Sequence, residues 1–338
     1  MQTTLLSFLG EKEIYPTIIY LNYIDDIYNV EYLNNIPSNS NHLGKIKWNY
    51  SKNDLNIYIN KNLESYDLYK FESKYTTKNV SLLKSQLQKS IRRMNTSLSI
   101  NICYQMINLD FNELLRRLLI ITLEDVFLNQ YFGILTWMMV AFSAKKWNPT
   151  NKDINWILNY VNYLCSISYR DKYSKIDSIH KSCDINDKLY SSLIFSIELR
   201  KSYGGMKGDI KMLNWFINEW NIRFKSNSEY IDFIKKNMIV VNILDENIVL
   251  VKPSEMLLEG CDFHNYPDIV NIIYSNNLQF KKEQIKEAIW QYSSKINFRN
   301  YIDNNIKDKP NHDYYNIWNE IKDLKNKLSI QYLIKYTI

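Results

Sequence analysis

The pattern of apolar and polar positions changes twice along the chain. Residues 45–50 and 55–60 alternate between apolar and polar side chains around a polar turn, which predicts a β-hairpin near the N-terminus. From residue 80 to 235 the apolar positions recur at helical spacing. A later apolar run, broken by an Asp-Glu-Asn turn, predicts a second hairpin around 238–252. The sequence therefore predicts a mainly α protein with small β additions.

The same pattern suggests four regions. They are a tail at 1–10, an irregular α/β region at 11–79 with a loop at 34–44, a helical domain at 80–235 and a C-terminal α+β region at 236–338. Helices are expected near 281–293 and 311–336. Since no apolar run reaches about 18 residues, we expect no membrane-spanning helix. The N-terminus lacks the basic stretch of a signal peptide.

Helix boundaries in the centre follow from local residue types. One apolar stripe runs through 81–95, formed by Leu83, Leu87, Ile91 and Met94. Thr96 or Ser97 is expected to cap the following helix. Asp110, with Glu113 three residues later, resembles a capping box and predicts the start of the next helix.

Composition points to an AT-rich genome. The chain has 27 Tyr but only 7 Gly, with three Ala and eight Arg, and it is rich in Asn, Ile and Lys. Codons for the abundant residues are AT-rich, as in a large DNA virus, a parasite or an organelle. Where such a chain uses Arg, Gly or Ala, we infer that the chemistry of that position required it. Ala141 and Ala144, for example, lie in the apolar segment 132–146, which predicts a closely packed central helix.

Charge and cysteine usage narrow the class of protein. The formal net charge of +6, from 42 basic and 36 acidic residues, is too small to identify a nucleic-acid-binding protein by itself. Four widely spaced cysteines without a CxxC motif fit a reducing, intracellular compartment such as the nucleus or a viral replication compartment. No histidine pair has the spacing of metal ligands, so we expect no metal site.

Half of the scarce arginines occur in two adjacent pairs. These are Arg92-Arg93 and Arg116-Arg117. On one interpretation they form intramolecular ion pairs, with Arg116 and Arg117 reaching Glu124 and Asp125 further along the same helix. On the other they form an electropositive surface, together with Lys89, for DNA phosphates or an acidic partner.

Residues 87–128 resemble a known helical region. The matching positions are Lys89-Ser90-Ile91-Arg92, then Arg116-Arg117-Leu118, then Glu124-Asp125-Val126. They resemble the region that follows the ATPase core in the maintenance-of-genome-stability and Werner-helicase-interacting AAA+ family. The resemblance implies a fold related to the clamp-loader collar and an oligomer. The chain departs from the family at Phe127, where the family has Gly, and it lacks a phosphate-binding P-loop, so we expect no ATPase and no cofactor.

The N-terminal tail resembles the short motif with which replication and repair proteins bind the sliding clamp, proliferating cell nuclear antigen. The matching residues are Gln2, Leu5, Phe8 and Leu9, the last replacing an aromatic residue. One helical turn would place the apolar side chains together as a plug for an apolar pocket. The alternative is a tail that folds onto its own domain.

A glycine-rich loop and a C-terminal cluster are further candidate sites. The loop holds Arg200, Lys201, Gly204, Gly205, Lys207, Gly208 and Asp209, and it is either a phosphate contact or a tight turn between helices at 188–202 and 209–222. Asp209 is expected to cap the second helix. Asp262 and His264 are either an acid–base pair or structural residues, and Arg299 either holds the Asp262 carboxylate or meets a ligand.

These observations favour a non-enzymatic DNA replication or repair accessory protein. It would bind a sliding clamp and would also contact DNA or replication proteins. We expect no association with a membrane. One alternative is an enzyme acting on nucleic acid or a nucleotide, with a site at 204–209, 262–264 and 299. Another is a structural or interaction protein of a large DNA virus or an organelle.

Overall fold

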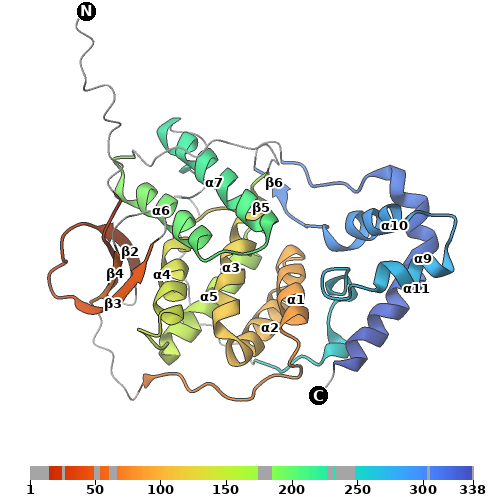
Figure 1. Cartoon of the computed structure of the whole chain (residues 1–338), viewed down its shortest axis with the longest axis horizontal. Coiled ribbons are helices and arrows are strands. Elements are labelled where there is room, and N and C mark those ends of the chain that lie inside the picture. The colour runs from red at the N-terminus through yellow and green to blue at the C-terminus, as the bar shows by residue number, and fades with distance from the viewer. Residues whose placement is uncertain are drawn as a thin grey trace, which may run out of the picture. The chain divides into compact units, whose positions relative to one another are not determined.

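The computed structural model confirms a mainly α fold with a small sheet near the N-terminus (Figure 1). It describes residues 15–24, 27–48, 54–60, 67–173, 185–226, 231–232, 234, 248–302 and 305–336. The proposed clamp-binding residues Gln2, Leu5, Phe8 and Leu9 lie outside these ranges, as does the 238–247 part of the second predicted hairpin. Residues 248–252 are described and form no strand, so that half of the predicted hairpin is wrong.

The described residues form two compact units whose segments alternate along the chain. Unit 1 combines the described parts of 1–63, 130–147 and 174–235, and unit 2 the described parts of 64–129, 148–173 and 236–338. The predicted region boundary at 235/236 matches the change from unit 1 to unit 2, whereas the boundary at 79/80 lies inside unit 2. Among the described residues, none of the helices combines the length and the apolar character needed to cross a bilayer.

Unit 1 contains a four-stranded sheet with the order β2-β1-β4-β3. Its strands are β1 (Ile18–Ile24), β2 (Ile27–Leu33), β3 (Asn41–Lys47) and β4 (Asp54–Ile59). The antiparallel pairing of β3 with β4 confirms the predicted N-terminal hairpin. β3 begins inside the predicted 34–44 loop, and β1, which pairs antiparallel with β2 and parallel with β4, was not predicted.

Unit 1 also contains the helices α4 (Phe132–Ser143), α6 (Lys188–Ser202) and α7 (Lys207–Ser226). α4 packs against β1, β2 and α6, which confirms the prediction of a buried helix. The indole Nε1 of its Trp137 donates to the Tyr58 carbonyl at 3.2 Å. α7 begins two residues before Asp209, which therefore lies in the first turn instead of capping the helix.

Unit 2 begins with α1 (Val80–Arg92), α2 (Thr96–Leu109) and α3 (Phe111–Asp125), which pack on one another, and continues with α5 (Asn151–Ser166). The Asp110 side chain accepts the Glu113 backbone N–H, as predicted for the start of α3. The cap of α2 is Asn95 and not Thr96 or Ser97, because the helix starts one residue earlier than the sequence suggested.

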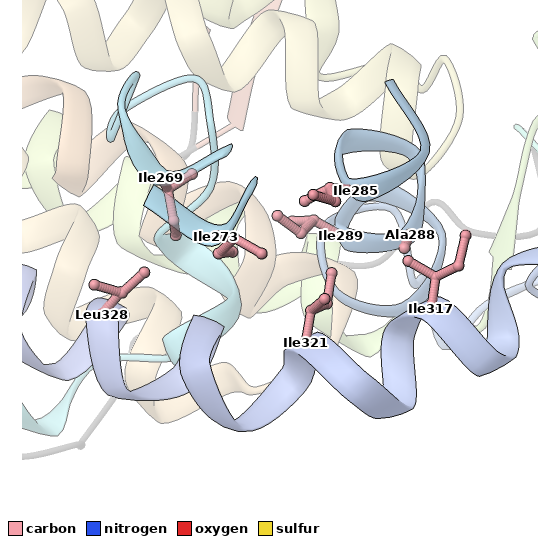
Figure 2. Packing of buried hydrophobic residues seen from close by; sticks show 8 residues of the cluster. All are labelled: Ile269, Ile273, Ile285, Ala288, Ile289, Ile317, Ile321 and Leu328. Carbon is pink, nitrogen blue, oxygen red and sulfur yellow. The ribbon is translucent and has the colours of Figure 1, made fainter. Parts of the chain in front are cut away.

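The C-terminal part of unit 2 has an apolar core of its own (Figure 2). It is formed by α9 (Ile269–Asn276), α10 (Lys282–Ile289) and α11 (Tyr315–Lys335). Ile285, Ala288 and Ile289 of α10 face Ile317 and Ile321 of α11. Shorter elements are β5 (Tyr169–Arg170), which pairs with β6 (Asn300–Tyr301), the 3-10 helices η3 (Pro253–Glu255), η4 (Leu258–Gly260) and η6 (His312–Tyr314), and the π-helical turn η5 (Trp290–Ser294).

Candidate functional site

An open cleft of about 450 Å³ lies in the C-terminal part of unit 2. One wall is the turn that follows η4, and the other is α10 with η5. The lining residues are Phe263, His264, Glu283, Lys286, Glu287 and Trp290. Both walls therefore carry aromatic rings and ionisable groups, a combination suited to binding a polar ligand.

The first wall presents an imidazole that a buried carboxylate orients. Asp262 is fully buried, and its Oδ1 accepts the backbone N–H of His264 and lies 2.9 Å from the ring Nδ1. Since a carboxylate can only accept, we infer that Nδ1 carries a proton, which in the neutral ring leaves Nε2 as an acceptor. The His264 side chain is 52% exposed, so its ring is accessible from the cleft.

A buried lysine of α1 holds this carboxylate. The Nζ of Lys89 lies 3.1 Å from Asp262 Oδ2, and both side chains are buried. Burial lowers the pKa of Lys89, against the opposing influence of the Asp262 charge. Burial alone would favour the neutral acid, but Lys89 and His264 hold the pKa of Asp262 well below its usual range. Lys89, Asp262 and His264 thus form a fixed chain of charged and polar groups.

Arg92, the last residue of α1, and its C-cap residue Arg93 hold the second wall. Arg92 Nη1 donates to the Ser294 carbonyl, and Arg93 Nη2 donates to the Ser293 carbonyl, each at 2.8 Å. These carbonyls lie at the C-terminal end of the π-helical turn, where the backbone carries partial negative charge. Three basic residues at the C-terminal end of α1 and its cap therefore position both walls of the cleft.

Arg92 also joins α1 to α3. Its guanidinium binds Glu124 at 2.8 Å and Asp125, while Gln88 donates to both carboxylates. Arg117 donates to the side-chain oxygen of Gln88. One interpretation of the sequence paired Arg116 and Arg117 with Glu124 and Asp125, and it is wrong. The two carboxylates lie on the face of α3 that packs against α1, and both bind Arg92 of that helix.

The remaining arginines of the two pairs have nearby partners as well. Arg116 pairs with Glu113 one turn earlier, at 3.1 Å, and Arg93 lies 3.7 Å from Glu259. Arg92 is buried, whereas Arg116 and Arg117 are partly exposed. The structure thus brings Lys89, Arg92, Glu124 and Asp125 into internal contacts, while DNA or partner contact by the basic residues stays a prediction.

The glycine-rich loop belongs to unit 1 and has the geometry of a tight turn. Gly204 (φ 73°) and Gly205 (φ 151°) adopt left-handed backbone conformations, while Gly208 lies within α7. Arg200 donates to the Gly204 carbonyl at 2.7 Å, and Lys201 donates to Asn214 at 2.9 Å. Lys207 is exposed and Asp209 half-buried in the first turn of α7. Anion binding by this loop stays a prediction.

Arg299 does not hold Asp262, which corrects one of the two roles suggested for it. Its guanidinium is buried and donates to the carbonyls of Ile91 and Leu164, so it fixes the C-terminal end of α1 against α5. Burial lowers the pKa of Arg299 to about 10. Lys89 holds the Asp262 carboxylate in place of Arg299, because the buried face of α1 packs near the turn that carries Asp262.

Sequence reasoning missed the acidic part of the cleft. Glu283 and Glu287 are four residues apart on α10, and Trp290 follows three residues later. That spacing places all three on one helix face and was visible in the sequence. It gave no indication that this face would meet His264, which requires the tertiary fold.

Comparison with known proteins adds no relative. No protein-family model, curated protein or solved structure matches this chain.

Within the described ranges, no group of three His, Cys, Asp or Glu side chains is arranged to hold a metal ion. Cys103, Cys165 and Cys261 are free thiols and buried.

Proposed function

We propose that this chain is an accessory protein of DNA replication or repair. A collar-like helical region would contact replication proteins or DNA, and the N-terminal tail would attach the chain to a sliding clamp. The observation that supports the proposal is the meeting of two stretches that resemble the collar family. Arg92 of the first of the three matching stretches binds Glu124 and Asp125 of the last. A coincidence of helical patterning alone would not require the matched charged residues to meet.

The ionic network gives this helical region a fixed register. Ion pairs removed from water add little net stability, because desolvation offsets their attraction, but they allow only one arrangement of the helices. Arg116 and Arg117 remain partly exposed on α3. In this proposal they are the basic residues best placed to reach DNA phosphates or an acidic partner.

Clamp attachment is supported by the spacing of Gln2, Leu5, Phe8 and Leu9 in the sequence. A binding assay between the full chain and a sliding clamp tests it, with Phe8→Ala as the disruptive variant and Leu6→Ala as an apolar control outside the motif. We expect Phe8→Ala to abolish binding and Leu6→Ala to leave it unchanged. A dissociation constant weaker than about 1 mM, or equal effects of the two variants, contradicts the proposal.

DNA contact is tested by titrating the full chain with duplex DNA at several salt concentrations. If Arg116 and Arg117 contact phosphates, replacing both with Ala reduces the slope of log affinity against log salt by about two. An unchanged slope, or binding that does not depend on salt, would show that these residues do not contact DNA.

A further inference from the structure

The cleft at His264 offers mainly hydrogen-bond acceptors. With Nδ1 engaged by Asp262, Nε2 of the neutral His264 ring is left to accept. Glu283 and Glu287 add two carboxylates, which also accept. Lys286 is the cation among the lining residues. A ligand that complements this surface must therefore bring several N–H or O–H donors.

The net charge of the lining favours a cation. Two carboxylates face one ammonium group, and the buried Asp262 charge is already matched by Lys89. A phosphate or carboxylate ligand would meet the acidic side of α10 without a compensating surplus of basic groups. The same charges attract a positively charged donor.

The aromatic walls suit a flat cation. Phe263 and His264 have ring centroids 4.4 Å apart, and Trp290 lies 6.4 Å from Phe263 and 6.2 Å from His264. The ring faces already attract cations of the chain itself, since Lys286 Nζ lies 4.8 Å from the Phe263 centroid and the Arg92 guanidinium 6.0 Å from that of Trp290. A planar cation can stack on such rings while its edge donates to the carboxylates.

The geometry of the cleft is set before any ligand arrives. Lys89 fixes the turn that carries His264, and Arg92 and Arg93 fix the backbone after Trp290. On α10, the Glu287 carboxylate accepts from the Gln291 amide at 2.6 Å. Little backbone entropy is therefore lost at the two walls on binding, which favours affinity for a small group.

We propose that this cleft binds the guanidinium group of an arginine side chain presented by a partner protein. A guanidinium is planar, permanently charged and carries five donors in a fork that matches a carboxylate. Glu283 and Glu287 would accept from its edge, His264 Nε2 would accept from a remaining N–H, and Trp290 would contact its face. Lysine presents a single point charge and fits this arrangement less well.

The test is a titration of the full chain with N-acetyl-arginine methylamide, followed by calorimetry or by amide chemical shifts. The matched probes are the citrulline analogue, which keeps the planar shape but is neutral, and the lysine analogue. We expect the arginine probe to bind with a dissociation constant of about 1 mM or tighter. The citrulline and lysine probes should bind about tenfold more weakly, because charge-assisted bidentate hydrogen bonds are lost.

Variants assign the binding to this cleft. Glu287→Gln should weaken arginine binding about tenfold, since one charge-assisted contact becomes neutral. Glu320→Gln, on the exposed surface of α11 and outside the lining, is the control and should leave binding unchanged. Thermal unfolding confirms that each variant is folded. Deletion of residues 1–10 should also leave binding unchanged, which separates this inference from clamp attachment.

Several results would overturn the inference. One is equal binding of the arginine and citrulline probes, and another is an equal effect of Glu287→Gln and Glu320→Gln on arginine binding. The third is no detectable binding of the arginine probe at concentrations well above the expected dissociation constant of about 1 mM. Binding of adenosine or guanosine monophosphate at this cleft, with no arginine binding, would instead assign the site to a nucleotide.

Discussion

Lys89 Nζ lies 3.1 Å from Asp262 Oδ2, although the two residues are 173 positions apart in the chain. The lysine side chain is 5% exposed and the aspartate side chain 0%. Because desolvation offsets most of the attraction in such a pair, its main effect is to fix geometry. The geometry that it fixes is the position of His264 in the cleft.

Removing one partner of this pair should destabilise the protein. Lys89→Met leaves the buried Asp262 carboxylate without its cation, and the free energy of unfolding is expected to fall by about 3–5 kcal/mol. Replacing both residues, as Lys89→Met with Asp262→Asn, should recover part of this loss because no charge is then left unpaired. Urea unfolding of the four proteins in this cycle measures the coupling, and additive losses would contradict it.

The two arginine pairs should differ sharply in their contribution to stability. Arg92→Met removes the partner of Glu124 and Asp125 from a buried position, with an expected loss of about 3–5 kcal/mol. Arg116→Met removes only a partly exposed pair with Glu113, with an expected loss below about 1 kcal/mol. Urea denaturation of both variants tests this difference. Losses of equal size would show that the buried network does not fix α1 on α3.

Lys325 makes stability depend on pH in the alkaline range. It is buried in α11, where its Nζ donates to the Leu258 carbonyl at 2.6 Å, and burial lowers its pKa from 10.5 to about 8. Between pH 8 and 10.5 the unfolded chain therefore binds more protons at this site than the folded chain. Stability from this residue rises with pH across that interval, by up to about 3 kcal/mol.

Comparison with Lys325→Met isolates this contribution, because the other titrating groups are common to both proteins. The free energy of unfolding of the wild type, relative to the variant, should increase between pH 7.5 and pH 10. This range spans most of the titration interval defined by the folded and unfolded pKa values. A difference that stays constant with pH would show that Lys325 titrates normally in the folded protein.

Two glycine substitutions should have opposite effects. A Cβ at Gly260 would lie 2.1 Å from the amide nitrogen of Gln86. The Gln86 side chain is held by hydrogen bonds to the backbone N–H and the carbonyl of Leu257. Gly260→Ala must displace this side chain and is expected to cost about 1–3 kcal/mol. A Cβ at Gly208 meets nothing within 4 Å. Gly208→Ala in the first turn of α7 should stabilise by up to about 1 kcal/mol. Opposite shifts in melting temperature are the expected result, and shifts of the same sign would contradict it.

The sheet shows why β3 and β4 were found from the sequence and the inner strand β1, like β2, was not. β3 and β4 alternate around a polar turn, and their pairing was predicted. β1 is an inner strand between β2 and β4, and α4 packs against it. Its first four residues are buried without alternation, so the period-two pattern that identifies a half-exposed strand is missing.

The candidate site was predictable in its parts but not in its assembly. Asp262 and His264 were identified as a possible pair, and they are hydrogen-bonded in the structure. Their role in a cleft depends on α10, whose Glu283 and Glu287 are distant in sequence, and on cations from α1. No local pattern connects these segments.

The sequence by itself determined the mainly helical class, the start of α3 at Asp110 and the bounds of α6, because helix caps and helix-forming residues act within one or two turns. Tertiary structure alone decided the partners of the charged residues. Arg92 meets Asp125, and Lys89 meets Asp262, only when distant segments pack together. A buried charge is tolerated when an opposite charge reaches it, and which charge does so is a property of the packing, not of the spacing along the chain.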